Sequence, residues 1–500
     1  MENAIPFEGC PFHAKLKTAA PPAARRFADV TGPKGPPVLG WRHNAFTFLT
    51  QPIQFMSALR EAHGNVARLS SGSNPSLFVK PFSRDEVQHP ATVFAFGADC
   101  NRSVLSDLET FQTRLPRGPQ SADFDALSHN ILFSNDAEHK RRRVRLMEVL
   151  KGSSLKAYHG TMIDLTQMML DRWQAGTVVD IEREMAWLSM NISSRCLYGL
   201  DATSDSENLA VRMCEMMNSL FSPVNLIPLD LPGTPYRRLL RNISSIKADL
   251  EQLIRSAQDS DGHDILSIIV RQQVEEHGQL NTDDLVGDAF VTFFAGHDTV
   301  HDALAWTLLL LAQHPEVAAD LHEEISQASP DGVLSYEQIF KLPLLDRVVK
   351  ESLRVLGPAL LFPRVVAKDT ELGGFEVPRG TEVVFSPYMT HIDPELYDDP
   401  HRFDPDRWRD IKPSAYEYLP FGAGRRTCLG AALGTMMLKL IVPMILQRFR
   451  LETVERDIDI RFHAVMGPKG GLPMRLHPQD QRFEDSPARI GGQVGSMVEW

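Results

Sequence analysis

The chain has 500 residues, of which 43% are hydrophobic and 23% are charged, and its formal net charge is −12. This composition is typical of a globular protein with a large core, and it excludes wholesale disorder. The acidic balance argues against a nucleic-acid binder, although it leaves room for a local basic patch.

The N-terminal part is predicted to be irregular, with short elements after it. Residues 1–31 are polar and contain no apolar run long enough for a signal peptide or a membrane anchor. A stiff proline-rich segment, GPKGPPVLG, follows. We then predict a helix over residues 53–63 and two short strands over residues 66–69 and 77–80, with the turn-forming sequence SSGSNPS between the strands.

The middle of the chain, residues 124–356, has mostly helical periodicity. Its clearest helix covers residues 283–314, with Thr282 as the expected cap and Pro315 directly after its end. At the helical rise this length spans about 50 Å, which is enough to cross a whole domain. Its acidic and histidine side chains would be costly in a bilayer, so we predict a buried helix and not a membrane span.

Beyond Pro358 the pattern changes to short strands and irregular segments. In chain order we predict strands over residues 371–377 and 382–385, an irregular segment up to Trp408, a helix after Gly430, and a turn over residues 466–471 between two further strands. Pro443 lies inside the last helix and should kink it. No repeat or linker divides the chain, so we predict a single large, mainly helical domain with small β-sheets.

The cysteines do not form a disulfide framework. They are odd in number, widely spaced and without a CxxC pair, which fits a reducing cytoplasm and excludes the usual zinc and iron–sulfur spacings. The five are Cys10, Cys100, Cys196, Cys214 and Cys428.

The last cysteine lies in a loop with a distinctive composition, FGAGRRTCLG, over residues 421–430. A helix-forming stretch follows, and the N-terminus of a helix favours a thiolate at Cys428. Gly424 and Gly430 would let the backbone approach a flat ligand closely. A lone cysteine is more often a buried structural residue. The surrounding glycines and arginine favour a ligand to a metal instead.

This loop resembles the haem-binding signature of the cytochrome P450 family, FxxGxRxCxG. The match includes every fixed position: Phe421, Gly424, Arg426, Cys428 and Gly430. The resemblance implies haem b (iron protoporphyrin IX) with Cys428 as its axial thiolate ligand. It also implies the fold of that family, mainly α with small β-sheets and a long central helix that crosses over the haem. We expect the haem domain to cover residues 32–476, with an N-terminal extension over residues 1–31 and a tail over residues 477–500.

A second resemblance is an ExxR motif on a predicted helix. Glu351 and Arg354 are three residues apart and can pair on one helix face. Most such pairs are solvated ion pairs. In the family, the pair joins an arginine of a later irregular segment, which implies a structural triad with Arg407 of FDPDRW.

A third resemblance lies in the long helix, at AGHDT, which is similar to the oxygen-activation motif of the family. Gly296, next to Ala295, costs a helix about 1 kcal/mol relative to alanine and suggests a close approach or a distortion. An acid beside a hydroxyl can deliver protons, so the resemblance makes Asp298 and Thr299 the candidate catalytic pair. In isolation the segment fits a solvated kink equally well.

Cations that match the haem-propionate contacts of the family occur in three segments. They are His139, Arg143, Arg364 and Arg426. We expect the neighbouring basic residues to point outward and to form a docking site for an acidic electron-transfer partner, although a merely solvated face is as good an interpretation. These neighbours are Lys140, Arg141, Arg142 and Arg145.

The positions that line the substrate pocket of the family are mostly apolar here, although any one of them could be an ordinary core residue. They are Phe290, Phe294, Leu360, Leu361, Phe362, Val465 and Met466. Residues 213–232, rich in Met, Leu, Phe and Pro, correspond to the mobile lid. This implies a hydrophobic substrate of the terpenoid, fatty acyl, steroid or polyketide type.

The resemblance thus implies a monooxygenase of secondary metabolism that uses O2 as co-substrate. The haem domain leaves no room for a reductase domain, so electrons from NAD(P)H should arrive through a separate ferredoxin- or flavodoxin-type partner. We expect a bacterial-type cytoplasmic monomer with no membrane anchor and no nucleic-acid partner. The alternatives are a haem-thiolate isomerase or peroxygenase that needs no reductase, and a non-catalytic haem or ligand-binding sensor.

Overall fold

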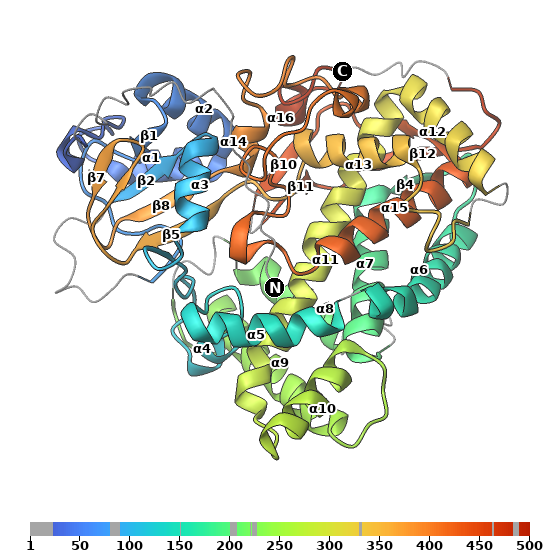
Figure 1. The fold of residues 1–500 in the computed structure, drawn as a ribbon, viewed down its shortest axis with the longest axis horizontal. Helices are drawn as coiled ribbons and strands as arrows, with labels where there is room; N and C mark the ends of the chain where they lie inside the picture. Colours follow the sequence, from blue (N-terminus) through green and yellow to red (C-terminus); the bar gives the residue numbers. More distant parts are fainter. Residues whose placement is uncertain are drawn as a thin grey trace, which may run out of the picture.

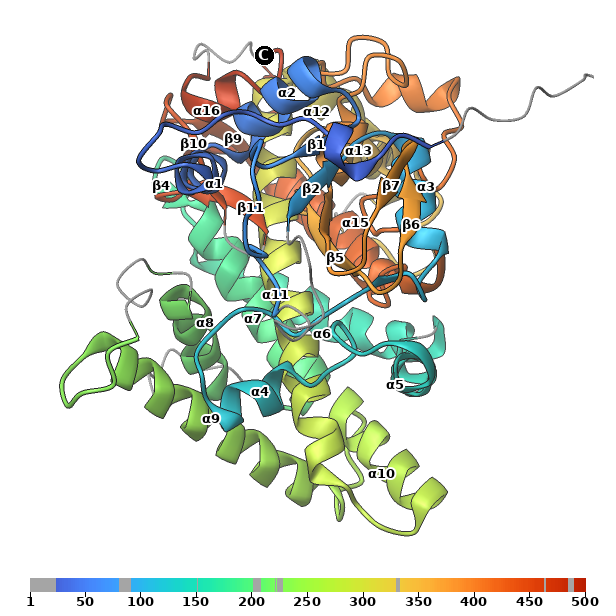
Figure 2. The same cartoon turned by 90° about the vertical axis from the view of Figure 1, so that its left-hand side faces the viewer.

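The computed structural model describes residues 24–80, 91–150, 152–200, 208–220, 222, 228–329, 333–462, 465–483 and 490–500. Helix α11 (Thr282–Gln313) runs through the middle of the molecule (Figure 1). A second view shows that α11 extends from the region of α9 (Pro235–Ala257) and α10 (Ile265–His277) into the part of the molecule that contains the sheets (Figure 2).

Helix α11 is surrounded by protein along most of its length, as its sequence predicts. All residues from Val300 to Leu311 are buried. The predicted bounds are confirmed to within one residue at each end, but the predicted cap is wrong, because the side chain of Asn281 and not that of Thr282 accepts a hydrogen bond from the Asp284 N–H (3.3 Å).

The other helices surround α11, and α7 has the most extensive contact with it. The remaining α-helices are α1 (Trp41–Thr50), α2 (Pro52–His63), α3 (Ala98–Ser106), α4 (Ala122–Ser128), α5 (Asp136–Val149), α6 (Gly152–Arg172), α7 (Ile181–Tyr198), α8 (Leu209–Leu220), α12 (Pro315–Ala328), α13 (Pro343–Val355), α14 (Pro387–His391), α15 (Ala431–Arg448) and α16 (Gly492–Gly495). The described residues also form the short 3₁₀ helices η1 (Phe27–Asp29), η4 (Pro405–Arg409) and η5 (Gly424–Arg426).

The sheets are small, as predicted. The largest has the strand order β1-β2-β8-β5-β3, in which β2 and β8 are parallel and the other pairs are antiparallel. Its strands are β1 (Val66–Arg68), β2 (Thr92–Ala95), β3 (Phe111–Gln112), β5 (Phe362–Val366) and β8 (Glu382–Phe385). The smaller sheets consist of β4 (Val178–Asp180), β12 (Pro473–Pro478) and β9 (Phe449–Thr453), of β6 (Thr370–Leu372) and β7 (Phe375–Val377), and of β10 (Asp459–Phe462) and β11 (Met466–Lys469).

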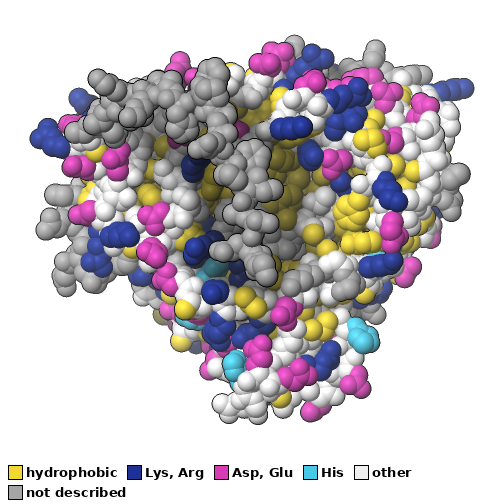
Figure 3. Space-filling view, in the orientation of Figure 1, with side chains coloured by type: hydrophobic (Ala, Val, Ile, Leu, Met, Phe, Trp, Pro, Cys, Tyr) yellow, Lys and Arg dark blue, Asp and Glu magenta, His cyan; other side chains and the backbone are white. Residues whose placement is uncertain are grey.

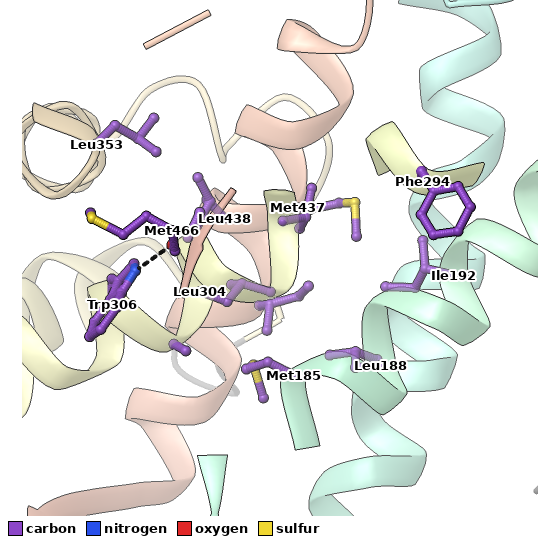
Figure 4. Close-up of a cluster of buried hydrophobic side chains, with 14 of the residues drawn as sticks. Met185, Leu188, Ile192, Phe294, Leu304, Trp306, Leu353, Met437, Leu438 and Met466 are labelled. Carbon is purple, nitrogen blue, oxygen red and sulfur yellow. Dashed lines mark hydrogen bonds between the residues drawn. The ribbon is translucent and has the colours of Figure 1, made fainter. Parts of the chain in front are cut away.

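The main core forms where α7, α11 and α15 meet. Side chains from the three helices lie close together there (Figure 4), among them Met185, Leu304 and Met437, and all three are buried. Trp306 is fully buried and donates from Nε1 to the main-chain oxygen of Met466 (3.0 Å), so the indole N–H is satisfied within the core.

Three predictions of local structure are wrong. Residues 77–80 form no strand, and only an isolated bridge joins Val79 to Pro116. The predicted strand over residues 371–377 is a hairpin of two strands, because Gly373 and Gly374 take positive φ angles of 55° and 79° at its turn. Residues 466–469 are strand β11 and not a turn.

The described part of the predicted C-terminal tail packs onto the domain. Ile490, Val494, Met497 and Val498 are buried in the main core. Residues 490–500 therefore contribute to the folded unit. The predicted lid, residues 213–232, is described only in part: α8 covers its beginning, and residues 221 and 223–227 lie outside the described residues. Cys10 lies outside them as well.

Among the described helices, α15 alone is long and apolar enough to cross a membrane. Its residues Met436–Leu446 are all buried in the core. Lys439 within this segment is ion-paired with Asp346 of α13 (2.6 Å). These contacts identify α15 as a core helix.

Candidate active site

The cysteine loop places Cys428 two residues before the N-cap of α15. Its backbone N–H donates to the Phe421 oxygen (2.8 Å), which closes the loop. Among the described cysteines, Cys428 is the exposed one, whereas Cys100 and Cys196 are buried. The sulfur nevertheless lies deep enough that burial raises the pKa of the thiol, against the opposing effects of the Gly430 N–H and Arg143. In the protein alone, burial therefore outweighs the expected lowering by the helix N-terminus.

Gly424 is required by the protein itself. Its φ angle is 67°, and a Cβ atom there would lie 2.9 Å from the Leu105 oxygen. The loop therefore packs closely against the end of α3 at this position. Gly430 has an ordinary φ of −84°, and a Cβ there would lie 3.9 Å from the Cys428 sulfur.

Asp298 and Thr299 lie together on α11. Thr299 Oγ1 donates to the Ala295 oxygen one turn earlier (2.7 Å). Asp298 is half-buried, and burial raises the pKa of its carboxyl group to about 6. Gly296 permits a close approach to α7, because a Cβ atom there would lie 3.1 Å from Ser193 Oγ.

The structure brings the four predicted propionate contacts together. Arg143 donates to the Thr427 oxygen of the cysteine loop (2.8 Å), and Arg426 donates to Asn135 Oδ1 (3.0 Å). Burial and the nearby Arg426 lower the pKa of Arg364 to about 9. Burial lowers the pKa of His139 to about 4, with further contributions from the charges of all three arginines. The four residues thus form one electropositive cluster beside the cysteine loop.

The predicted triad residues are also adjacent. Arg354 donates to Glu351 through Nε (2.9 Å) and Nη2 (2.7 Å), and both side chains are fully buried. Arg407 Nε lies 2.9 Å from Glu351 Oε1. Trp408, which sequence reasoning did not include, donates from its indole N–H to Glu351 Oε2 (2.9 Å). Glu351 therefore links α13 to η4.

The predicted outward orientation of the basic residues of α5 is wrong for Arg142 and Arg145, which are buried. Arg142 is paired with Asp288 (2.8 Å), and Arg145 with Asp284 (3.0 Å). Arg141 is partly exposed but binds Asp284 through two hydrogen bonds of 2.8 Å. These arginines attach α5 to α11. Of the four, only Lys140 is exposed without such a contact to α11.

The predicted pocket residues lie in the interior, apart from Phe362 and Val465, which are partly exposed. The rings of Phe290 and Phe294 are in edge contact, with centroids 4.8 Å apart. Leu360, Leu361 and Met466 are buried in the main core. The face drawn in Figure 3 is hollowed near its centre, and hydrophobic side chains are visible inside the hollow.

A second charged group borders Asp298. It joins His301 and Asp302 of α11 to Glu182 of α7 and Arg461 of β10. Sequence reasoning used the α11 members only as an argument against a membrane span. The i, i+4 spacing of Asp298 and Asp302 could have placed them on one helix face, but nothing local indicates Glu182 or Arg461 as partners.

Comparisons with known proteins agree with this geometry. The sequence pattern of the family described as Cytochrome P450 matches residues 33–473. The chain is 30% identical over 474 residues to a cyclooctat-9-en-7-ol 5-monooxygenase of Streptomyces melanosporofaciens, covering 93% of this chain and 98% of the relative. It is 30% identical over 481 residues to a pentalenene oxygenase of Streptomyces avermitilis, covering 93% of this chain and 99% of the relative.

Solved structures show the same fold. A cyanobacterial cytochrome P450 with bound retinoic acid superposes with a TM-score of 0.76 at 24% identity, covering 91% of this chain and all of that one. The haem domain of cytochrome P450DA also gives a TM-score of 0.76, at 21% identity, covering 92% of this chain and all of that domain. The chain therefore belongs to the cytochrome P450 family and is a cytochrome P450 monooxygenase.

Proposed function

We propose that this enzyme inserts one oxygen atom from O2 into a terpenoid-type hydrophobic molecule, with Cys428 as the axial ligand of the haem. The main support for this proposal is the position of Cys428. It is exposed beside the electropositive cluster, and nearby carboxylates neutralise little of the positive charge of that cluster. An electropositive cluster next to a thiolate ligand is the arrangement that an anionic, iron-containing macrocycle requires.

The cation cluster fits haem because its charges are not balanced by protein. Arg364 is buried, and its contacts among the described residues are the Pro363 oxygen (2.8 Å) and the Phe385 ring. Its Nε atom is buried without a hydrogen-bond partner. Among the described residues, the carboxylate that raises the pKa of a member of this cluster is Asp136, which acts on Arg426. Two propionates would supply the missing negative charge, held by Arg364, Arg426, Arg143 and His139.

Replacing Arg364 by glutamine is expected to speed haem loss about 10- to 100-fold, because a hydrogen bond to a charged group contributes about 1.5–3 kcal/mol. The transfer of haem to excess apomyoglobin measures this rate. Arg409→Gln, at an exposed ion pair of η4, is the matched control and should leave the rate unchanged. An unchanged rate in the Arg364 variant would exclude Arg364 as a propionate contact.

When bound, thiolate-ligated haem supplies O2 activation, and the electron donation of the thiolate favours O–O cleavage. The residues of α11 would supply the protons. A carboxyl group with a pKa near 6 can both take and release a proton near neutral pH, and this is the value to which burial raises the pKa of Asp298. Thr299, the next residue, can orient a proton donor while its hydroxyl is held by the Ala295 oxygen (2.7 Å).

Replacing Asp298 by asparagine should lower kcat about 100-fold, the lower end of the effect of a positioned general acid. Asparagine has almost the same shape but cannot carry the proton. The fall in kcat as the pH rises through about 6 should disappear, because Asp298 must carry a proton to act as the acid and loses that proton above its pKa. Substrate affinity should not change. Asp320→Asn, at an exposed position of α12, is the control. A variant with the kcat and pH profile of the wild type would contradict the assignment.

The substrate proposal is supported by two observations. Helix α11 carries apolar side chains such as Phe290 and Phe294, and the hollow in Figure 3 contains hydrophobic side chains. The names of two relatives give their substrates as pentalenene and cyclooctat-9-en-7-ol. The ending of the first name denotes a hydrocarbon, and that of the second an alcohol.

An optical titration of the ferric enzyme tests the substrate class. Terpenoids, fatty acids, steroids and polyketides are added in turn, and displacement of an iron-bound water shifts the spectrum from low to high spin. A saturable shift with terpenoids, followed by an oxygenated product under turnover, supports the proposal. A shift only with another class would replace the terpenoid by that class.

We further propose that electrons from NAD(P)H reach this enzyme through a separate ferredoxin- or flavodoxin-type partner, and that the enzyme is a cytoplasmic monomer. Arg425 of the cysteine loop and Lys140 of the adjoining helix α5 are exposed and offer positive charge to an acidic partner. Product formed per NAD(P)H oxidised, measured with each partner type, distinguishes the two. Turnover without any electron source would instead support the isomerase alternative.

A further inference from the structure

A charged cluster connects the surface of the protein to Asp298. His301 Nε2 lies 3.0 Å from Asp302 Oδ1 and 3.8 Å from Glu182 Oε1. The ligand atoms of His297, Asp298 and His301 all lie within 4.8 Å of one another. These distances are each short enough for a direct contact or for one bridging water.

The cluster has a buried middle and two partly exposed ends. The side chains of His301 and Asp302 are 5% and 0% exposed, whereas those of Glu182 and Asp298 are 20% and 23% exposed. Asp298 is the end next to Thr299. His301 is therefore the buried group that lies between two partly exposed carboxylates, Glu182 and the proposed proton donor.

The orientation of the His301 ring is fixed. Nδ1 lies 3.2 Å from the His297 oxygen, a carbonyl that can only accept, so Nδ1 carries a proton. Nε2 is then the nitrogen that can gain and lose a proton. Arg461 donates to Asp302 Oδ1 (2.9 Å) and holds it beside Nε2. Room for this pair depends on Gly467, where a Cβ atom would lie 1.9 Å from Asp302 Oδ1.

When all its groups are ionised, the cluster has one negative charge in excess. The carboxylates of Glu182, Asp298 and Asp302 then face only two cations, His301 and Arg461. One additional proton would neutralise this excess charge. Burial raises the pKa of both Glu182 and Asp298, so the extra proton is held at either end. Burial alone would lower the pKa of His301, but Asp302 and Asp298 outweigh it and raise that pKa.

A metal ion is a poorer explanation of the same residues. The guanidinium of Arg461 lies 3.3 Å from His301 Nε2, 2.9 Å from Asp302 and 3.7 Å from Glu182. The positive charge of Arg461 already occupies the position at which these three groups could bind a cation. Repulsion between Arg461 and a divalent ion would weaken binding there.

We propose that His301 relays protons from Glu182 to Asp298, with Asp302 and Arg461 as positioning residues. The proposal rests on the role of Asp298 proposed above. His301 gives the proton on Nε2 to the Asp298 carboxylate through one bridging water, and the imidazole, neutral after this step, takes a proton from Glu182, which is reprotonated from the solvent. Each pass along the relay moves one proton inward, so the two protons consumed in a monooxygenase turnover take two passes. No electron is transferred within the cluster.

The first test is His301→Gln, which removes the titrating group and keeps a polar side chain of similar length. We expect kcat to fall at least about tenfold, a smaller loss than that from a directly acting acid. The kinetic solvent isotope effect on kcat should increase, and the spin-state titration with substrate should be unchanged. His322→Gln, at another buried histidine on α12, is the control.

The second test does not depend on turnover. Imidazole NMR of the diamagnetic ferrous carbon monoxide form should show His301 titrating above about 6.5, the ordinary value. Glu182→Gln removes a nearby negative charge and should lower that pKa. It should also reduce kcat, which keeps the proposal testable if His301→Gln fails to fold. A His301 pKa that does not respond to Glu182→Gln would overturn the coupling.

The two proposals fail in distinguishable ways. If Asp298→Asn lowers kcat but His301→Gln and Glu182→Gln behave like the wild type, the relay is wrong and the role of Asp298 stands. If Asp298→Asn itself behaves like the wild type, the assignment of Asp298 as proton donor is wrong, and the relay that depends on it is wrong as well.

Discussion

Replacing Glu351 by alanine is expected to destabilise the native fold severely. Glu351 and Arg354 are both fully buried, and the carboxylate also accepts hydrogen bonds from Arg407 and Trp408. Removal of one partner leaves a buried, uncompensated guanidinium, which costs about 3–5 kcal/mol. That loss is a large share of the roughly 5–15 kcal/mol by which domains are stable.

The expected loss can be measured by urea unfolding and by the haem content of the purified protein. Glu376→Ala, at an exposed position of β7, is the matched control and should unfold like the wild type. Glu351→Gln should be less damaging than alanine, because the amide oxygen can still accept some of the five hydrogen bonds that the carboxylate accepts. An alanine variant with the stability of the wild type would show that Glu351 does not hold α13 and η4 together.

Replacing Cys428 by serine is expected to reduce oxygenation to background. Serine keeps the size of the side chain and the hydrogen bond between the residue 428 N–H and the Phe421 oxygen (2.8 Å), so the loop should fold. Its hydroxyl is far less acidic than a thiol and supplies no thiolate donation to the iron. The loss should therefore occur in the chemistry and not in stability.

Product formation with a reconstituted redox partner and the unfolding midpoint measure these two effects separately. Cys100→Ala changes a buried cysteine in a second, smaller hydrophobic core next to the five-stranded sheet, and this variant should retain activity. Wild-type rates of oxygenation in Cys428→Ser would contradict the assignment of Cys428 as the functional ligand.

The features that the sequence predicted well are local ones. The 32 residues of α11 follow from a long, mostly apolar helical pattern with a polar cap before it and Pro315 after it. The cysteine loop and the ExxR motif are short, so their residues are neighbours in space whatever the rest of the chain does. The fold as a whole came from the resemblance of these motifs to a known family and not from periodicity.

The features that the sequence missed depend on distant partners. Arg142 and Arg145 have the composition of a solvated helix face, but they bind Asp288 and Asp284, which lie about 140 positions later. Likewise, no local pattern indicates that Arg461 of β10 reaches Asp302. A buried charge is stable only with its counter-charge, and sequence alone does not show where that counter-charge lies.

The absorption spectrum of the ferrous carbon monoxide complex of the wild-type enzyme tests the central claim most directly, because the position of its main band depends on the ligand opposite the carbon monoxide. We predict the strongly red-shifted band that thiolate ligation produces, retained in Cys100→Ala and lost in Cys428→Ser. A wild-type protein that contains haem but lacks this band would contradict the account, because Cys428 would then not be the ligand of the iron.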